Sequence, residues 1–229
     1  LSWDNWLEVF RNLRPGAGRA DLSVMVPGDV SLKLGVVSAT ALVSGLHQDS
    51  DLSTVSGDLV VDSVTGDLRL NSVSGDFTVR NHDGKITAHT VSGDTTAQGA
   101  IHSFSADGVS GEVYLDITGI PDEVKVNTVT GNVMTRIDAG VPVSYAISTV
   151  SGRLQLDDAQ IRGVRGRYTA KSGELERHWL DFRTNTVSGD VTVLHTVRAD
   201  NAAAITQVEA IQSGIQCGCV VSVTAPRRS

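Results

Sequence analysis

Aromatic residues, cysteines and long apolar runs are all scarce in this chain of 229 residues. Only two cysteines occur, Cys217 and Cys219, so disulfide bonds cannot hold the fold together as they do in small secreted scaffolds. These cysteines supply at most half of a zinc site, and no histidine near them in sequence completes it. No apolar run approaches the roughly 20 residues of a membrane-spanning helix. Aromatics make up 4% of the residues, which suits a narrow interior.

Basic side chains are also in the minority, with 19 Lys and Arg against 26 Asp and Glu and a formal net charge of −7. This balance argues against nucleic-acid binding, which needs a basic face. The one basic run, residues 162–168, is interpreted as a solvated loop. Hydrophobic residues make up 40% of the chain, enough for a core, so wholesale disorder is excluded. No export signal is visible, which favours the cytoplasm, with the cell envelope as the alternative.

A five-residue motif of the form Thr-Val-Ser-Gly-Asp dominates what is present. Such repetition decides the architecture, because each unit buries its apolar side against the next. Glycine tolerates the positive φ of a tight turn, and Ser and Asp side chains hydrogen-bond nearby backbone groups. We therefore predict a structural turn at each copy. The predicted turn residues are Gly57, Asp58, Gly66, Asp67, Gly75, Asp76, Gly93, Asp94, Gly111, Gly131, Gly152, Gly189 and Asp190.

Between residues 57 and 98 the repeat has a period of nine. Counted from the turn glycine, the third and fifth positions are mostly apolar, and they share one face of a strand because side chains alternate. The eighth position is assigned to the interior as well. The third positions hold Leu59, Leu68, Phe77, Ile86 and Thr95, the fifth Val61, Leu70, Val79, Ala88 and Ala97, and the eighth Val64, Val73, His82 and Val91.

Equivalent turns recur in steps of 18 at residues 58, 76, 94 and 112, then in steps of 20, 21 and 21, and finally in a step of 16 to residue 190. Two strands thus form one coil. We predict an all-β fold, a flattened β-solenoid of about 18–21 residues per coil with the coils stacked in chain order. A twisted repeat sandwich is the alternative. Seven steps of ~4.8 Å give a body roughly 34 Å long, with turns in the longer coils at 119–122 and 140–142.

The N-terminal segment has a different pattern. Trp3, Trp6, Leu7 and Phe10 recur at helical spacing within residues 3–13. We predict a short amphipathic helix that caps the open end of the solenoid, because an uncapped end exposes hydrogen-bonding strand edges. Docking to a partner or a membrane surface is the alternative, although the segment lacks the basic face of membrane-surface helices.

Three segments follow from these patterns. Residues 1–19 form the helix and its linker, residues 20–195 the solenoid, and residues 196–229 a tail of uncertain structure. The tail lacks the turn motif, and we expect a short helix followed by a strand through Val220, Val221 and Val223.

Stacking would align Asp58, Asp76, Asp94 and Glu112 along one edge. Calcium-binding nonapeptide repeats use paired glycines and a sixth-position Asp, whereas each unit here offers one Gly and one Asp, so turn chemistry is favoured over a cation stripe. The six histidines show no metal-ligand spacing, and no serine lies in a nucleophile elbow. The sequence therefore predicts no catalytic residue, no metal site, no cofactor and no enzymatic activity.

The serial Thr-Val-Ser-Gly-Asp motifs, the Val26-Pro27 segment and the closing segment 183–193 resemble a known bacterial family over residues 20–195. It is the putative-adhesin β-strand-repeat family, domain of unknown function 4097, in its actinobacterial type. The resemblance implies a repetitive β-solenoid without established catalytic residues, and a link of some relatives to cell-envelope stress.

The function expected from the sequence is a non-catalytic scaffold or adhesin-like module that binds a protein partner or itself. A cation- or glycan-binding surface module is the alternative, and a carbohydrate-active solenoid enzyme is less favoured. No nucleic-acid partner is expected, and nothing in the chain indicates membrane association.

Overall fold

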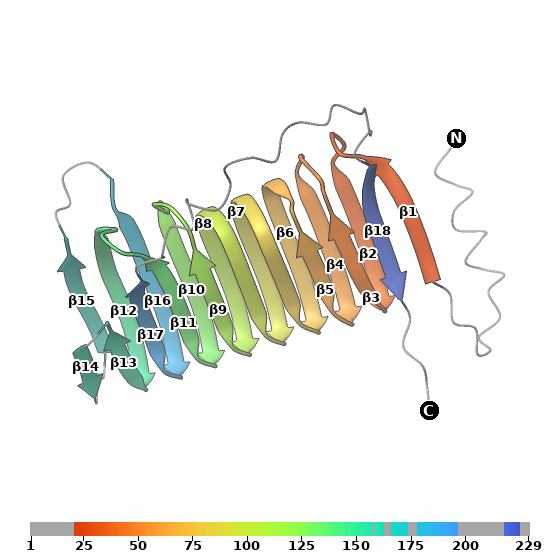
Figure 1. Cartoon of the computed structure of the whole chain (residues 1–229). Helices are drawn as coiled ribbons and strands as arrows, with labels where there is room; N and C mark the ends of the chain where they lie inside the picture. Colours follow the sequence, from red (N-terminus) through yellow and green to blue (C-terminus); the bar gives the residue numbers. More distant parts are fainter. Residues whose placement is uncertain (1–20, 158, 163–165, 174–177, 197–217, 225–229) are drawn as a thin grey trace.

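The computed structural model describes residues 21–157, 159–162, 166–173, 178–196 and 218–224. Within these ranges the chain is all-β and forms the predicted β-solenoid, a row of stacked coils (Figure 1). The predicted N-terminal capping helix and the predicted helix of the tail lie outside the described residues. None of the described segments is a helix long and apolar enough to cross a membrane.

Each regular coil contributes one strand to each of two facing stacks, here called sheet A and sheet B. In β7 and β8 the strand pairing continues from sheet B into sheet A, so each of these strands belongs to both sheets. In stacking order, sheet A contains β2 (Leu32–Ser38), β4 (Ser50–Ser56), β6 (Thr65–Ser74), the second halves of β7 (Phe77–Ser92) and β8 (Thr95–Ser110), β10 (Glu123–Thr130), β16 (Leu180–Ser188), β12 (Val143–Ser151) and β15 (Gly166–Ser172). Sheet B contains β1 (Asp21–Pro27), β18 (Gly218–Thr224), β3 (Thr40–Ser44), β5 (Leu59–Asp62), the first halves of β7 and β8, β9 (Val113–Ile117), β11 (Val133–Asp138), β17 (Val191–Thr196), β13 (Arg153–Leu156) and β14 (Ala159–Arg162).

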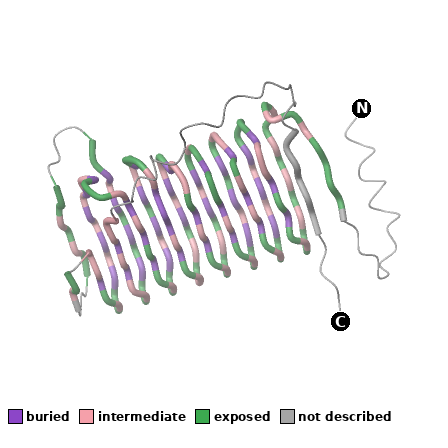
Figure 2. Tube along the Cα trace, in the orientation of Figure 1, coloured by how far each residue is buried: buried purple, intermediate pink, exposed green. Residues whose placement is uncertain are grey.

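The hydrophobic core lies between the two sheets and runs the length of the stack (Figure 2). The residues at the third and fifth positions of the nonamer are buried, as the alternation predicts; Leu59, Phe77 and Ile86 are each at most 1% exposed. Few larger rings enter the core: Phe104 and Phe182 are fully buried in sheet A, and Phe182 packs edge-to-face on Tyr145 with 6.0 Å between the ring centroids. The strand predicted through Val220, Val221 and Val223 is present as β18.

The eighth position of the nonamer does not face inward in every unit. Val64 and His82 are 1% exposed, but Val73 and Val91 are 51% and 50% exposed, so the interior assignment of the latter two was wrong. Ser63 and Asn81, just before the buried pair, have positive φ values of 54° and 50°. This left-handed residue turns the chain sharply and points the next side chain inward, whereas the other corner keeps the regular alternation.

The coils do not stack in chain order, contrary to the sequence-based expectation. The last coil, β16 and β17, lies between the coil of β10 and β11 and the coil of β12 and β13. Asp190 is therefore not the end of the row, because it lies between Asn132 and Arg153. Lys171-Ser172-Gly173, an incomplete copy of the motif one 21-residue step after Gly152, does not form a parallel coil either, since β15 runs antiparallel to β12.

Asp157 lies beside the inserted coil, where the chain reverses after β13. Its φ of 50° reverses the chain after β13, so that β14 folds back as an antiparallel hairpin instead of continuing the coil. The Asp157 carboxylate accepts a hydrogen bond from the His195 backbone N–H at 2.7 Å and contacts His195 Nδ1 at 2.8 Å. The open place in the stack arises earlier, between β11 and β12, where the chain skips one coil position that β16 and β17 later fill.

The chain crosses from sheet A to sheet B at the A-to-B corner, where the predicted Ser-Gly-Asp turns lie, and returns at the B-to-A corner. Seven glycines stack at the A-to-B corner, and a Cβ atom on any of them would lie 1.9–2.3 Å from the carbonyl oxygen of the neighbouring coil. No side chain fits at that distance. These glycines are Gly57, Gly75, Gly93, Gly111, Gly131, Gly189 and Gly152. Gly66, by contrast, lies at the B-to-A corner.

We expect Gly93→Ala to destabilise the fold by about 1–3 kcal/mol, because its Cβ would lie 2.2 Å from the Gly75 oxygen at a φ of +139°. Gly108→Ala, one coil away, is the matched control, since its nearest neighbours are 3.6 and 3.7 Å distant and it should change stability by less than ~0.5 kcal/mol. Urea unfolding followed by circular dichroism measures both. Equal losses would contradict a backbone contact specific to the corner.

His82 is buried at the B-to-A corner, next to Val64 of the preceding coil. Burial lowers the pKa of His82, because the interior disfavours the charged imidazolium. As pH falls below about 6.5, the unfolded state therefore binds a proton that the folded state does not, and stability decreases. We expect His82→Val, which copies Val64, to flatten this dependence between pH 7 and 5. An unchanged pH slope in urea titrations would show that other groups cause it.

Candidate functional surface

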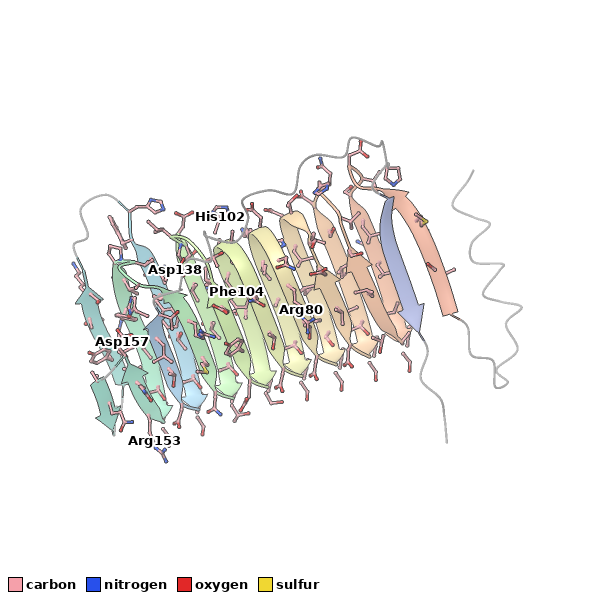
Figure 3. The ribbon with its side chains drawn as sticks, viewed as in Figure 1. Arg80, His102, Phe104, Asp138, Arg153 and Asp157 are labelled. Carbon is pink, nitrogen blue, oxygen red and sulfur yellow. The ribbon has the colours of Figure 1, made fainter. Side chains whose placement is uncertain are left out.

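One row of exposed apolar side chains runs along the A-to-B corner, and we call it the valine ridge. It has one valine per coil, each 45–70% exposed, whereas the residue immediately before each valine faces the core side of sheet A. The in-register parallel pairing stacks the coils at ~4.8 Å, so the ridge is roughly 34 Å long. In Figure 3 this corner is marked by Arg153 at the lower edge of the view. In stacking order the ridge comprises Val37, Val55, Val73, Val91, Val109, Val129, Val187 and Val150.

An acidic row follows the ridge three residues later in the sequence. Each aspartate Oδ1 accepts the backbone N–H of the equivalent residue in the next coil, at 3.1 Å from Asp58 to Asp76 and 2.8 Å from Asp76 to Asp94. Asp94 continues the ladder to Glu112 at 2.8 Å. The predicted turn carboxylates therefore act as acceptors for backbone groups that the corner would otherwise leave unpaired.

The ladder continues through the rearranged coils with other side chains. Asn132 Nδ2 donates to Glu112 Oε1 at 2.9 Å, and Asn132 Oδ1 accepts the Asp190 N–H at 3.0 Å. Asp190 Oδ1 accepts the Arg153 N–H at 2.8 Å. One border of the ridge thus carries five carboxylates, which gives it a negative character over most of its length.

The other border of the ridge is the outer face of sheet A, which is hollowed near its far end. An open hollow of about 520 Å³ lies between Val129, Val187 and Val150 of the ridge and Arg167 of β15. Its floor carries a polar ladder, in which Asn185 Nδ2 donates to Asn127 Oδ1 and Asn127 Nδ2 donates to Asp107 Oδ1, each at 2.7 Å. The ridge therefore combines an apolar crest with hydrogen-bonding groups beside it.

The other described histidines lie apart from the ridge or pair singly with aspartates. His102 contacts Asp83 at 3.1 Å at the B-to-A corner, and His178 contacts Asp122 at 2.8 Å. His89 lies 3.4 Å from Asp107 on the outer face of sheet A. Among the described residues, no group of three or more histidine, cysteine or acidic side chains is arranged to hold a metal ion.

Sequence reasoning assigned the glycine and aspartate of each motif to turns, and the structure places them at the corners, but it missed the ridge. The missed signal was the valine itself, which recurs in front of almost every Ser-Gly pair of the motif. Side chains along a strand alternate between its two faces. If the Thr or Ser before the valine faces inward, the valine itself therefore lies on the outer face.

The chain resembles known proteins in its structure and not in its sequence. No family model matches the chain, and no curated protein sequence matches it. Among solved structures, the fold is similar to one described as a putative cell adhesion protein from Clostridium sporogenes, with a TM-score of 0.43 and 11% sequence identity, covering 78% of this chain and all of that one.

We expect Asp94→Ala to cost about 0.5–1.5 kcal/mol, because the Glu112 N–H loses its acceptor. Asp94→Asn should stay close to the unmodified protein, since it keeps the Oδ1 acceptor and Asn132 already plays this role in a neighbouring coil. Thermal and urea unfolding of the two variants separate the hydrogen bond from the charge. A loss as large for the Asn variant as for the Ala variant would mean that the charge dominates.

Proposed function

We propose that this chain is a non-catalytic scaffold or adhesin-like module that binds a protein partner along the valine ridge. The observation that carries the proposal is the ridge itself, eight half-exposed valines in an unbroken row. Single exposed apolar residues are normal on protein surfaces, whereas a contiguous apolar patch with a polar border marks an interaction site. The close backbone packing at the seven corner glycines supports the proposal, because an ordered backbone reduces the entropy lost on binding.

The borders of the ridge specify the partner further. The carboxylate row beside it favours a partner with basic side chains next to an apolar strip. The Asn ladder on the other border supplies amides for additional hydrogen bonds. Such a surface needs no cofactor and no metal, and it recognises shape and charge.

A triple variant tests the ridge directly. Val73→Thr, Val91→Thr and Val109→Thr keep the β-branched shape and replace exposed methyl groups by hydroxyls, so each should change stability by less than ~0.5 kcal/mol. The control carries Arg80→Ala, Lys85→Ala and Gln98→Ala, three exposed residues of the same coils away from the ridge. Unmodified, ridge-variant and control proteins are immobilised and exposed to lysate and to the envelope fraction of the producing cells.

We expect proteins that bind the unmodified chain and the control to be lost from the ridge variant, because the apolar contact is removed. Equal recovery on all three proteins, or no recovery above background on any, would reject the ridge as the binding surface. Protease treatment of intact cells then separates the two forms of the proposal. Cleavage of the chain supports the adhesin-like form, and protection supports an internal scaffold.

A further inference from the structure

The two sheets end at different levels at the N-terminal end of the solenoid. Within the described part of the chain, sheet A ends at β2, which pairs only with β4, while sheet B continues past β3 through β18 and β1 (Figure 1). Sheet B therefore projects by two strands beyond its partner sheet. We call the inner face of this projection the ledge.

The ledge presents core-facing apolar side chains to solvent. The register places Leu22 and Val24 of β1 opposite Val223 and Val221 of β18, which in turn pair with Ala41 and Val43 of β3. Directly paired residues point to the same face of a sheet, so Leu22 and Val24 face the same side as the core. Ala41 and Val43 are fully buried, whereas Leu22 is 60% and Val24 40% exposed.

The last strand of sheet A is open in the same way. Its inward residues Leu32, Leu34 and Val36 are only half-buried, although the equivalent Leu68 and Leu70 further along the stack are at most 1% exposed. Among the described strands, β2 is an edge strand that pairs on one side only, and such an edge carries backbone groups available for pairing. Lys33 does not block this end, because it lies on the outer face and pairs with Asp51 at 3.3 Å.

The dimensions of the gap suit a helix. Two absent strands leave a width of about 10 Å opposite the ledge, which is the diameter of an α-helix with its side chains. The seven residues of β1 span about 23 Å, and an 11-residue helix is about 16 Å long, so such a helix fits along the strand. A pair of β-strands from a second molecule would fit as well.

We propose that residues 3–13 dock on the ledge and close the core at this end, with Trp3, Trp6, Leu7 and Phe10 against Leu22 and Val24. Residues 1–20 lie outside the described part, and their sequence carries the apolar stripe that the ledge requires. The segment joins β1 at Asp21, so it is tethered to the ledge itself. A tethered segment has a millimolar effective concentration, which a second copy in dilute solution does not reach.

The test compares charge placed on either side of the predicted helix in the full chain. Trp6→Asp with Phe10→Asp puts two carboxylates on the apolar stripe, and Asn5→Asp with Asn12→Asp puts them on the opposite side. On the ledge, Leu22→Asp is paired with Ser23→Asp, which alters the other face of β1. The readouts are binding of the dye ANS to exposed apolar surface, melting temperature and sedimentation. Tryptophan emission is recorded for the chain with Trp179→Phe and no other change, which leaves only Trp3 and Trp6 as reporters.

We expect the stripe variant and Leu22→Asp to raise ANS binding and lower the melting temperature by several degrees, while both controls leave these values unchanged. Tryptophan emission should be blue-shifted in the Trp179→Phe chain, and the unmodified protein should sediment as a monomer. Stripe and control variants that behave alike would overturn the proposal. So would a dimer whose dissociation exposes the ledge, because a second copy would then be its cover. Neither result bears on binding by the valine ridge.

Discussion

The close approach of successive backbones at the A-to-B corner is the constraint on which the rest of this structure depends. Parallel strands in register require every coil to turn at the same place, and there the glycine of one coil lies against the carbonyl oxygen of the preceding coil in the stack. A Cβ atom at 1.9–2.3 Å from that oxygen would force the coils apart. Without the glycine column, the facing sheets could not keep the spacing that buries their inner side chains.

Register at the corner also converts a sequence repeat into surface rows. Because every coil turns alike, residues one repeat apart become neighbours, so one valine per coil becomes an apolar ridge and one aspartate per coil becomes a hydrogen-bonded acidic row. The same logic explains why the ladder tolerates Asn132 in place of an acid. The row needs an acceptor for the next N–H, and an amide oxygen supplies it.

The repeat made most of the fold predictable, and the exceptions have local causes. Leu59 and Val61 could be placed in the core because side chains alternate between the two faces of a strand. The sequence could not distinguish the exposed Val73 from the buried Val64, because that difference depends on the left-handed conformation of Ser63. The order of the coils was beyond sequence spacing, because the chain skips one coil position between β11 and β12 and a later segment fills it, where His195 contacts Asp157. The ridge was hidden for a related reason, since a valine in a strand is most simply read as core.

Regular spacing also limits what can bind along the whole ridge. The valines recur at ~4.8 Å, whereas a strand laid lengthwise repeats each side-chain position every ~6.7 Å and a helix rises ~5.4 Å per turn. The side chains of a lengthwise strand or a helix would lose register with the valines within a few coils. Such a partner would therefore contact only part of the ridge. A partner that itself stacks strands has the same ~4.8 Å repeat and stays in step throughout. In the proposed binding role, the spacing of the ridge is therefore best matched by another stacked β-structure, and partners of other folds would contact only a short stretch of it.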